Sequence, residues 1–223
     1  MPAQLVLPLT SQPSLTRNDF LVSPGNAQAV ALIDQWPNWP VHVAALYGPA
    51  GSGKTHLVSI WQSLSGARVV SASMLDLEPM RKGPLAVEDV DSDPPSEARD
   101  ARLFQLIEGA APGSPLLLTG KEAPAGWPSL LPDLASRFSA VLSLPLWKAD
   151  EALLARLAQK LLADRQLSVP DSLVERVIQS VERSPEAVRE FIARADAKAL
   201  SEARPITISL VRELLAEADE GLS

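Results

Sequence analysis

Residues 48–55 have the spacing of a phosphate-binding loop, in which glycine stands at the first and sixth positions and lysine and threonine follow. The loop reads Gly48, Pro49, Ala50, Gly51, Ser52, Gly53, Lys54 and Thr55. Its small residues allow successive backbone N–H groups to point into one concavity at the start of a helix, where a β-phosphate binds. Lys54 would reach the β- and γ-phosphates, and the Thr55 hydroxyl would bind Mg²⁺. The pattern therefore predicts a site for ATP or ADP with Mg²⁺.

An acidic pair, Glu88 and Asp89, ends the apolar run at 84–87. In P-loop ATPases this place holds one acid that binds the metal and one that activates water. Glu88 is therefore a second candidate ligand for Mg²⁺, and both acids are candidate catalytic residues. Thr119 ends another apolar run, where its hydroxyl would lie beside the phosphates and orient water. The alternative for all three residues is an ordinary polar end to a strand.

Two arginines stand where they would reach a nucleotide. Arg137 precedes the apolar run at 140–144 and would project into a neighbour's site as an arginine finger, which stabilises the charge of phosphoryl transfer. The alternative is a solvated arginine or a structural ion pair. Arg189 lies on an expected helix that would fold onto the γ-phosphate. Spacing alone favours the alternative for Arg189, a surface pair with Glu186 or Glu190.

Short apolar runs alternate with helical segments over the first two thirds of the chain. This alternation is typical of a parallel sheet with helices on its faces. We expect strands at 41–47, 67–72, 84–89, 115–119 and 140–144, and helices at 26–36, 54–63, 97–110 and 130–138. The fold class is therefore α/β, with a five-stranded parallel sheet.

The pattern changes near residue 147, and from residue 150 onward only helical periodicity remains. We expect four short helices, one of which begins with Ser184 as N-cap and Pro185 at its first position. The chain thus divides into a tail at 1–18, a nucleotide-binding core at 19–146 and a small all-α lid at 147–223.

Composition narrows the function classes. The net charge of −7 disfavours strong direct binding to DNA, which needs a basic face. The absence of cysteine excludes disulfides and cysteine-bound zinc and fits a reducing cytoplasm. No apolar run approaches the ~18 residues of a membrane span, and no secretory signal pattern opens the chain. We expect a cytoplasmic protein that contacts no membrane.

The polar tail contains one apolar cluster. It consists of Gln4, Leu5, Val6, Leu7, Pro8 and Leu9. A peptide this short has no core of its own, so it either packs back onto the domain or docks in a groove of a partner. The residues alone leave both possibilities open.

The order of phosphate loop, acidic strand end, strand-end threonine and two later arginines resembles that of AAA+ ATPases. Residues 134–138 resemble the arginine-finger box of the bacterial replication initiator DnaA, and residues 187–190 resemble its sensor-2 helix. Residues 4–9 are similar to the peptide by which Hda-type paralogues of DnaA bind the replicative sliding clamp. The resemblance covers about residues 4–218 and points to these paralogues.

This resemblance implies a negative regulator of replication initiation. Arg137 would act in trans on ATP held by DnaA and convert the initiator to its inactive ADP form. Gln4, Leu5, Leu7, Pro8 and Leu9 would bind the sliding clamp. Besides the phosphate loop, the expected nucleotide contacts are Phe20, Leu21, Val22, His56, Thr119 and Arg189. AAA+ domains often pair through the nucleotide face, so we expect a homodimer.

Two absences favour the paralogue over the initiator. The initiator's basic C-terminal helix-turn-helix domain has no counterpart in this sequence. Only residues 73–83 separate the second and third expected strands, which is too short for the initiator's additional helices.

Two departures from the family pattern predict weak or absent intrinsic hydrolysis. Glu88 stands where the family has aspartate, and Lys121 stands where it usually has an acid. The longer glutamate would shift the carboxylate that Mg²⁺ needs in near-octahedral geometry. The main alternative is a self-sufficient AAA+ ATPase or loader that remodels a replication partner. A nucleotide-dependent DNA-binding module is disfavoured by the negative charge.

Overall fold

The computed structural model describes residues 15–77, 82–167 and 169–220. The apolar peptide at 4–9 lies outside the described residues. Within them, no helix is long and apolar enough to cross a membrane.

A parallel sheet of five strands forms the centre of the first part of the chain, with the order β2-β3-β4-β1-β5. The strands are β1 (Val43–Tyr47), β2 (Arg68–Ser71), β3 (Leu85–Glu88), β4 (Leu116–Gly120) and β5 (Leu142–Pro145). Each expected strand is present, with its ends shifted by a residue or two. The predicted five-stranded parallel sheet is therefore confirmed.

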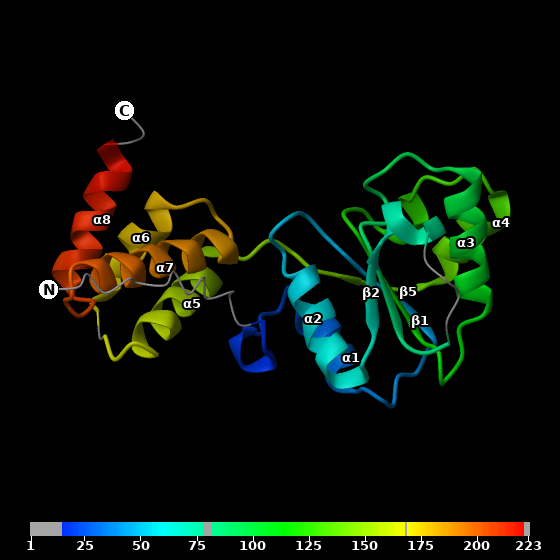
Figure 1. Ribbon diagram of the computed structural model, residues 1–223, viewed down its shortest axis with the longest axis horizontal. Coiled ribbons are helices and arrows are strands. Elements are labelled where there is room, and N and C mark those ends of the chain that lie inside the picture. Colours follow the sequence, from blue (N-terminus) through cyan, green and yellow to red (C-terminus); the bar gives the residue numbers. More distant parts are fainter. Residues whose placement is uncertain (1–14, 78–81, 168, 221–223) are drawn as a thin grey trace, which may run out of the picture.

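Helices cover both faces of this sheet (Figure 1). One face carries α1 (Ala27–Asp34) and α2 (Lys54–Ser65), and the other carries α3 (Glu97–Glu108) and α4 (Pro132–Ala140). Strand β4 shows why both faces are apolar. Its side chains alternate, so Leu117 packs with the α1–α2 cluster whereas Leu116 and Leu118 pack with the α3–α4 cluster.

Short 3-10 segments complete this part of the chain. They are η1 (Arg17–Asp19), η2 (Ala72–Leu77) and η3 (Pro124–Gly126). In the described part of the link between β2 and β3, η2 is the helical element, which agrees with the expectation that this link is too short for two α-helices.

The second part is all helical, as predicted. It contains α5 (Glu151–Ala163), α6 (Asp171–Ser180), α7 (Pro185–Ser201) and α8 (Ile208–Glu220). The Ser184 side chain accepts a hydrogen bond from the backbone N–H of Ala187, which confirms the predicted N-cap of α7. Phe191 on this helix is fully buried among apolar side chains of α5, α6 and α8.

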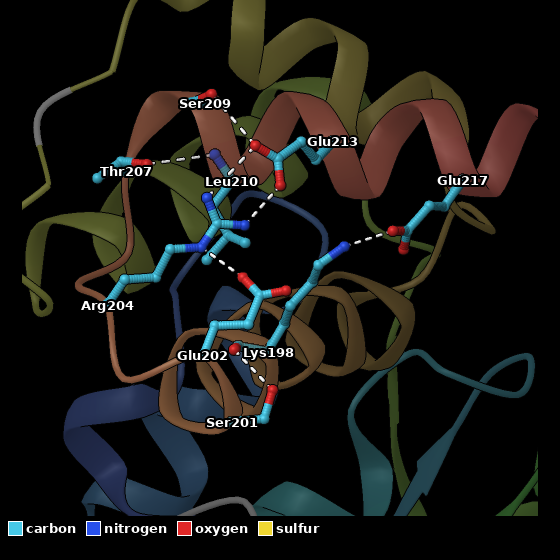
Figure 2. Close-up of polar contacts among 9 residues, drawn as sticks. All are labelled: Lys198, Ser201, Glu202, Arg204, Thr207, Ser209, Leu210, Glu213 and Glu217. Atoms are coloured by element: carbon cyan, nitrogen blue, oxygen red, sulfur yellow. Dashed lines mark hydrogen bonds and ion pairs between the residues drawn. The ribbon is translucent and has the colours of Figure 1, made fainter.

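A polar network joins the end of α7 to α8 (Figure 2). Arg204 forms ion pairs with Glu202 and Glu213, and Lys198 pairs with Glu217. The hydrogen bond from Arg204 lowers the pKa of the Glu213 carboxyl. Exposed pairs of this kind contribute little and are screened by salt, so the apolar cluster around Phe191 holds these helices together.

Candidate nucleotide-binding site

At two positions of the phosphate loop, the backbone leaves room for glycine alone. Gly48 and Gly53 have φ angles of +152° and +100°. A Cβ atom on Gly48 would lie 2.0 Å from the carbonyl oxygen of Leu146, and one on Gly53 would lie 2.9 Å from Cε2 of Phe20. The loop is therefore pressed against the segment that leaves β5 and against the Phe20 ring. These contacts hold the shape of the loop.

The Lys54 ammonium lies inside the loop. Its Nζ donates hydrogen bonds to the carbonyl oxygens of Gly48 at 2.7 Å and Pro49 at 3.0 Å. Burial lowers the pKa of Lys54, while the nearby carboxylates of Asp89 and Asp91 act in the opposite direction. Burial of the Lys54 ammonium costs free energy, which a nearby negative charge offsets. A phosphate bound in the loop would supply that charge and accept hydrogen bonds from Nζ.

The two predicted Mg²⁺ ligands are brought together. The Thr55 hydroxyl at the start of α2 donates a 2.8 Å hydrogen bond to Oε1 of Glu88 at the end of β3. In the described part of the chain, no cluster of three or more His, Cys, Asp or Glu side chains could hold a metal alone. Mg²⁺ is commonly bound by one or two protein oxygens together with phosphates and water, so this oxygen pair fits it in that role.

Asp89 and Thr119 form a second contact beside the loop, between the carboxyl ends of β3 and β4. Asp89 has a left-handed φ of 59°, which aspartate tolerates better than most residues. Its N–H donates to the hydroxyl of the buried Thr119 at 3.1 Å, and the N–H of Val90 donates to the Thr119 carbonyl at 2.9 Å. Thr119 thus holds the turn that aims Asp89. Since Gly48 in turn donates to the carbonyl of Gly120, the ends of β3, β4 and β1 meet at one place.

Asp91 also lies at these strand ends, and the sequence analysis did not identify it as a site residue. Its Oδ2 accepts hydrogen bonds from the N–H groups of Lys121 at 2.7 Å and Glu122 at 2.8 Å. This holds the turn after β4, where Lys121 lies close enough to lower the pKa of Lys54. The sequence offered one signal for Asp91, its position two residues after the Glu88–Asp89 pair. Its partners lie 30 and 31 residues away, so no local pattern showed them.

Residues 16–21, here named the N-terminal strap, run between the sheet and the helical part (Figure 1). Arg17 forms a two-point ion pair with Asp34 of α1, with both contacts at 2.8 Å. Asp19 pairs with Lys160 of α5 at 3.0 Å, and Leu21 packs in the apolar cluster of α5, α6 and α7. The strap therefore connects the two parts of the structure.

Arg189 contacts this strap. Its Nη2 donates a 3.1 Å hydrogen bond to the carbonyl oxygen of Asp19. The start of its helix nevertheless lies at the phosphate loop, because a Cβ on Gly51 would be 3.2 Å from Cβ of Ser184. The structure thus places Arg189 on a half-buried helix that adjoins the loop.

His56 and Phe20 lie beside the loop and against each other. The rings meet edge to face with centroids 5.1 Å apart, and Nε2 of His56 is 3.0 Å from the Thr16 carbonyl. Because a carbonyl only accepts, this nitrogen carries the proton in the neutral ring. Of the other expected adenine-side residues, Leu21 packs into the helical part and Val22 is 40% exposed.

Arg137 is not part of this site. It lies on α4, and its Nε is 2.8 Å from Oε1 of Glu108. Helix α4 ends just before β5, whose first residue, Leu142, is opposite Ala44 near the start of β1. The phosphate loop follows the other end of β1. Arg137 is therefore near the opposite end of the strands from the phosphate loop, on the face that α3 and α4 cover.

Comparison with known proteins identifies the fold. No family model and no curated protein matches the sequence. Domain III of the Thermotoga maritima replication initiation protein DnaA matches with a TM-score of 0.67 at 16% identity, covering 92% of this chain and 97% of that chain. Aquifex aeolicus DnaA bound to AMPPCP matches with a TM-score of 0.66 at 15% identity, covering 81% of this chain and 64% of that chain.

A Thermotoga maritima RuvB variant also matches, with a TM-score of 0.63 at 17% identity, covering 86% of this chain and 67% of that chain. The chain spans less than two thirds of the longer DnaA structure. At such identities the likeness shows the fold alone. The chain shares its five-stranded parallel α/β sheet followed by helices with domain III of DnaA, and the predicted α/β fold class is confirmed.

The position of Lys54 predicts the effect of removing it. We expect Lys54→Ala to weaken binding of ADP and ATP by about one to two orders of magnitude, because a charge-assisted contact to phosphate is lost. Titration calorimetry with each nucleotide measures this. Lys198→Ala, which removes an ammonium from the helical part, is the control with unchanged binding. Equal affinities of Lys54→Ala and the unmodified chain would contradict the assignment.

The buried His56 predicts a pH dependence of stability. Burial lowers the pKa of His56 below its ordinary value of 6.5, so below that pH the unfolded chain takes up a proton that the folded protein resists. The contribution of neutral His56 to the free energy of unfolding should be fully present above about pH 6.5. It should be lost as the pH falls toward the pKa of His56 in the folded protein.

Urea unfolding at about pH 7.5 and about pH 5.5 measures this loss. His56→Gln should reduce the difference between the two pH values, since glutamine retains an N–H donor for Thr16 and does not titrate. The matched control is His42→Gln at the other, exposed histidine. An unchanged pH dependence in His56→Gln would show that other groups cause the loss.

Proposed function

We propose that this chain is a DnaA-related AAA+ protein that binds an adenine nucleotide and stimulates hydrolysis of ATP held by DnaA. Arg137 would enter the partner's site as an arginine finger, and replication initiation would be restrained as a result. The observation that carries the proposal is the position of Arg137, half-exposed at the opposite end of the strands from its own phosphate loop. From there its side chain serves another molecule's nucleotide better than its own.

The proposed nucleotide site uses the residues that meet at the carboxyl ends of β1, β3 and β4. The loop N–H groups and Lys54 would hold the phosphates, and Thr55 and Glu88 would hold Mg²⁺. The metal supplies neutralisation of the phosphate charge when it is bound. Phe20, Leu21, Val22 and His56 would line the adenine side, and Arg189 would leave the Asp19 carbonyl to contact phosphate.

Two features support weak hydrolysis by this chain itself. The Glu88 carboxylate is hydrogen-bonded to Thr55, and Lys121 adds a positive charge beside Lys54. A nucleotide held in this way would serve mainly to set the angle between the helical part and the sheet. That angle would determine how Arg137 is presented.

The proposed partners follow from the tail and from the pairing of AAA+ domains. Residues 4–9 would bind the sliding clamp and bring the protein to loaded clamps on DNA in the cytoplasm. The tail directly precedes the N-terminal strap in the chain. A homodimer would form through the nucleotide face.

A second candidate function is that of a self-sufficient AAA+ ATPase or loader. The observation that favours it is that Lys54, Thr55, Glu88 and Asp89, the residue types that an ATPase uses, lie around one loop. This candidate predicts turnover by the chain alone, which Lys54→Ala or Asp89→Ala would abolish.

The test of the proposal is hydrolysis of radiolabelled ATP preloaded on DnaA, with clamps loaded on DNA. The unmodified chain should accelerate hydrolysis, and Arg137→Ala should reduce the acceleration by more than about 100-fold, since an arginine finger contributes about 10³–10⁵ in rate. Arg183→Ala, an exposed arginine paired with Glu151 in the helical part, is the matched control.

Deletion of residues 1–14 separates the clamp contact from the chemistry. The deletion should abolish clamp binding and the clamp-dependent acceleration while the unfolding curve stays unchanged. Absence of acceleration by the unmodified chain, with clamp binding intact, would exclude DnaA as the target. Acceleration that persists in Arg137→Ala would exclude the finger.

A further inference from the structure

The arginine proposed as the finger forms an ion pair with Glu108. Nε of Arg137 lies 2.8 Å from Oε1 of Glu108, and the two side chains are 51% and 44% exposed. Glu108 is the last residue of α3, and Arg137 is in the last turn of α4. The two residues are 29 positions apart in sequence, and the packing of α3 beside α4 brings them together.

The helices below this pair are firmly anchored. Leu103 of α3 and both Leu134 and Phe138 of α4 are fully buried in one apolar cluster, where the Phe138 ring meets Trp127 edge to face. Phe138 directly follows Arg137, so burial of the phenylalanine directs the arginine outward. The ion pair therefore sits on two rigid supports, with its charged groups at the surface.

Glu108 occupies an unfavourable place for a carboxylate. The C-terminal end of a helix carries partial negative charge, which disfavours an acid there and favours a cation. Arg137, at the end of α4, stands where a cation is favoured. The structure thus places an acid against its own helix end, beside one arginine that offsets this cost.

The atoms used by the contact decide what it does. The carboxylate meets Nε, on the stem side of the guanidinium. Over the part of the chain that the structure describes, neither terminal Nη group of Arg137 forms a hydrogen bond. These groups form the two-donor fork that binds carboxylate or phosphate oxygens. A carboxylate on the fork would block it, whereas one on Nε restricts rotation of the guanidinium and leaves the fork accessible.

We propose that Glu108 is a positioning residue that holds Arg137 in the orientation in which it enters the partner's nucleotide site. This inference rests on the proposed function, because it concerns the same arginine acting on the same phosphates. Glu108 itself touches no reacting atom. It acts by reducing the orientations that the exposed arginine samples before the two proteins meet.

The expected effect is on rate and not on affinity or stability. Loss of orientation at a reacting centre lowers the rate by about 10-fold or more. We therefore expect Glu108→Ala to lower the maximal rate of DnaA-bound ATP hydrolysis by about 10-fold, with the half-saturating concentration of this chain unchanged. The midpoint of urea unfolding should also be unchanged, because an exposed pair contributes little to stability.

The experiment compares Glu108→Ala, Glu108→Gln and Glu108→Asp in the full chain with DnaA and clamp-loaded DNA. Glu108→Gln should lose nearly as much rate as Glu108→Ala, since its amide binds a guanidinium weakly. Glu108→Asp should recover part of the rate. Glu151→Ala, which breaks the exposed pair with Arg183, is the matched control with an unchanged rate. In an Arg137→Lys background, which lacks Nε, Glu108→Ala should change the residual rate less than about twofold.

Each other outcome overturns the inference in a recognisable way. A normal rate in Glu108→Ala, alongside loss in Arg137→Ala, removes the role of Glu108 and leaves the proposed function standing. A faster rate in Glu108→Ala would mean that the pair masks the finger. A fall in unfolding midpoint that parallels the fall in rate would make Glu108 a structural residue. If Arg137→Ala retains full stimulation, the proposed function itself fails.

Discussion

The phosphate loop has no space for a side chain at either of its two most constrained glycines. The Leu146 carbonyl fills the place of a Cβ at Gly48, and the Phe20 ring fills it at Gly53. The loop is consequently held by the exit from β5 on one side and by the N-terminal strap on the other. Because the strap also holds Lys160 and Arg189, the same packing that shapes the loop connects the sheet to the helical part. A ligand bound in the loop would therefore lie next to the strap, whose contacts join the sheet to the helical part.

Charge is distributed unevenly about this loop. Lys54 and Lys121 lie near the acids Glu88, Asp89 and Asp91 at the carboxyl ends of the strands. The hydroxyl and the carbonyl of Thr119 accept hydrogen bonds that hold the acidic turn in place. Arg137 lies near the opposite ends of the strands with its own carboxylate partner. The proposed function assigns the phosphates to the first end and the outward-facing cation to a partner molecule. This separation is what a protein that binds one nucleotide and acts on another would need.

Much of this arrangement could be predicted from local sequence, and the remainder could not for identifiable reasons. Apolar runs such as 115–119 predicted the strands because a parallel sheet buried on both faces needs them, and the spacing of 48–55 located the loop. The contacts of Asp91, Arg189 and Arg137 were beyond such reasoning. Each depends on packing that joins distant segments: β3 with the turn after β4, α7 with the strap, and α4 with α3.

The Arg189 contact illustrates this limit. Spacing alone favoured a pair with Glu186 or Glu190 on the same helix. It could not show the hydrogen bond that Arg189 donates to the backbone of Asp19, 170 residues away. Strand and helix ends also shifted by a residue or two, since hydrogen bonds from neighbouring strands determine where a strand stops.

The most direct measurement asks which molecule's ATP is hydrolysed. In a single-turnover experiment, this chain and DnaA are each loaded with ATP carrying a different radioactive label and mixed on clamp-loaded DNA. Faster conversion of the DnaA-bound label alone is the predicted result. Rapid hydrolysis of the label on this chain, equally fast without DnaA, would contradict action in trans and identify a self-sufficient ATPase.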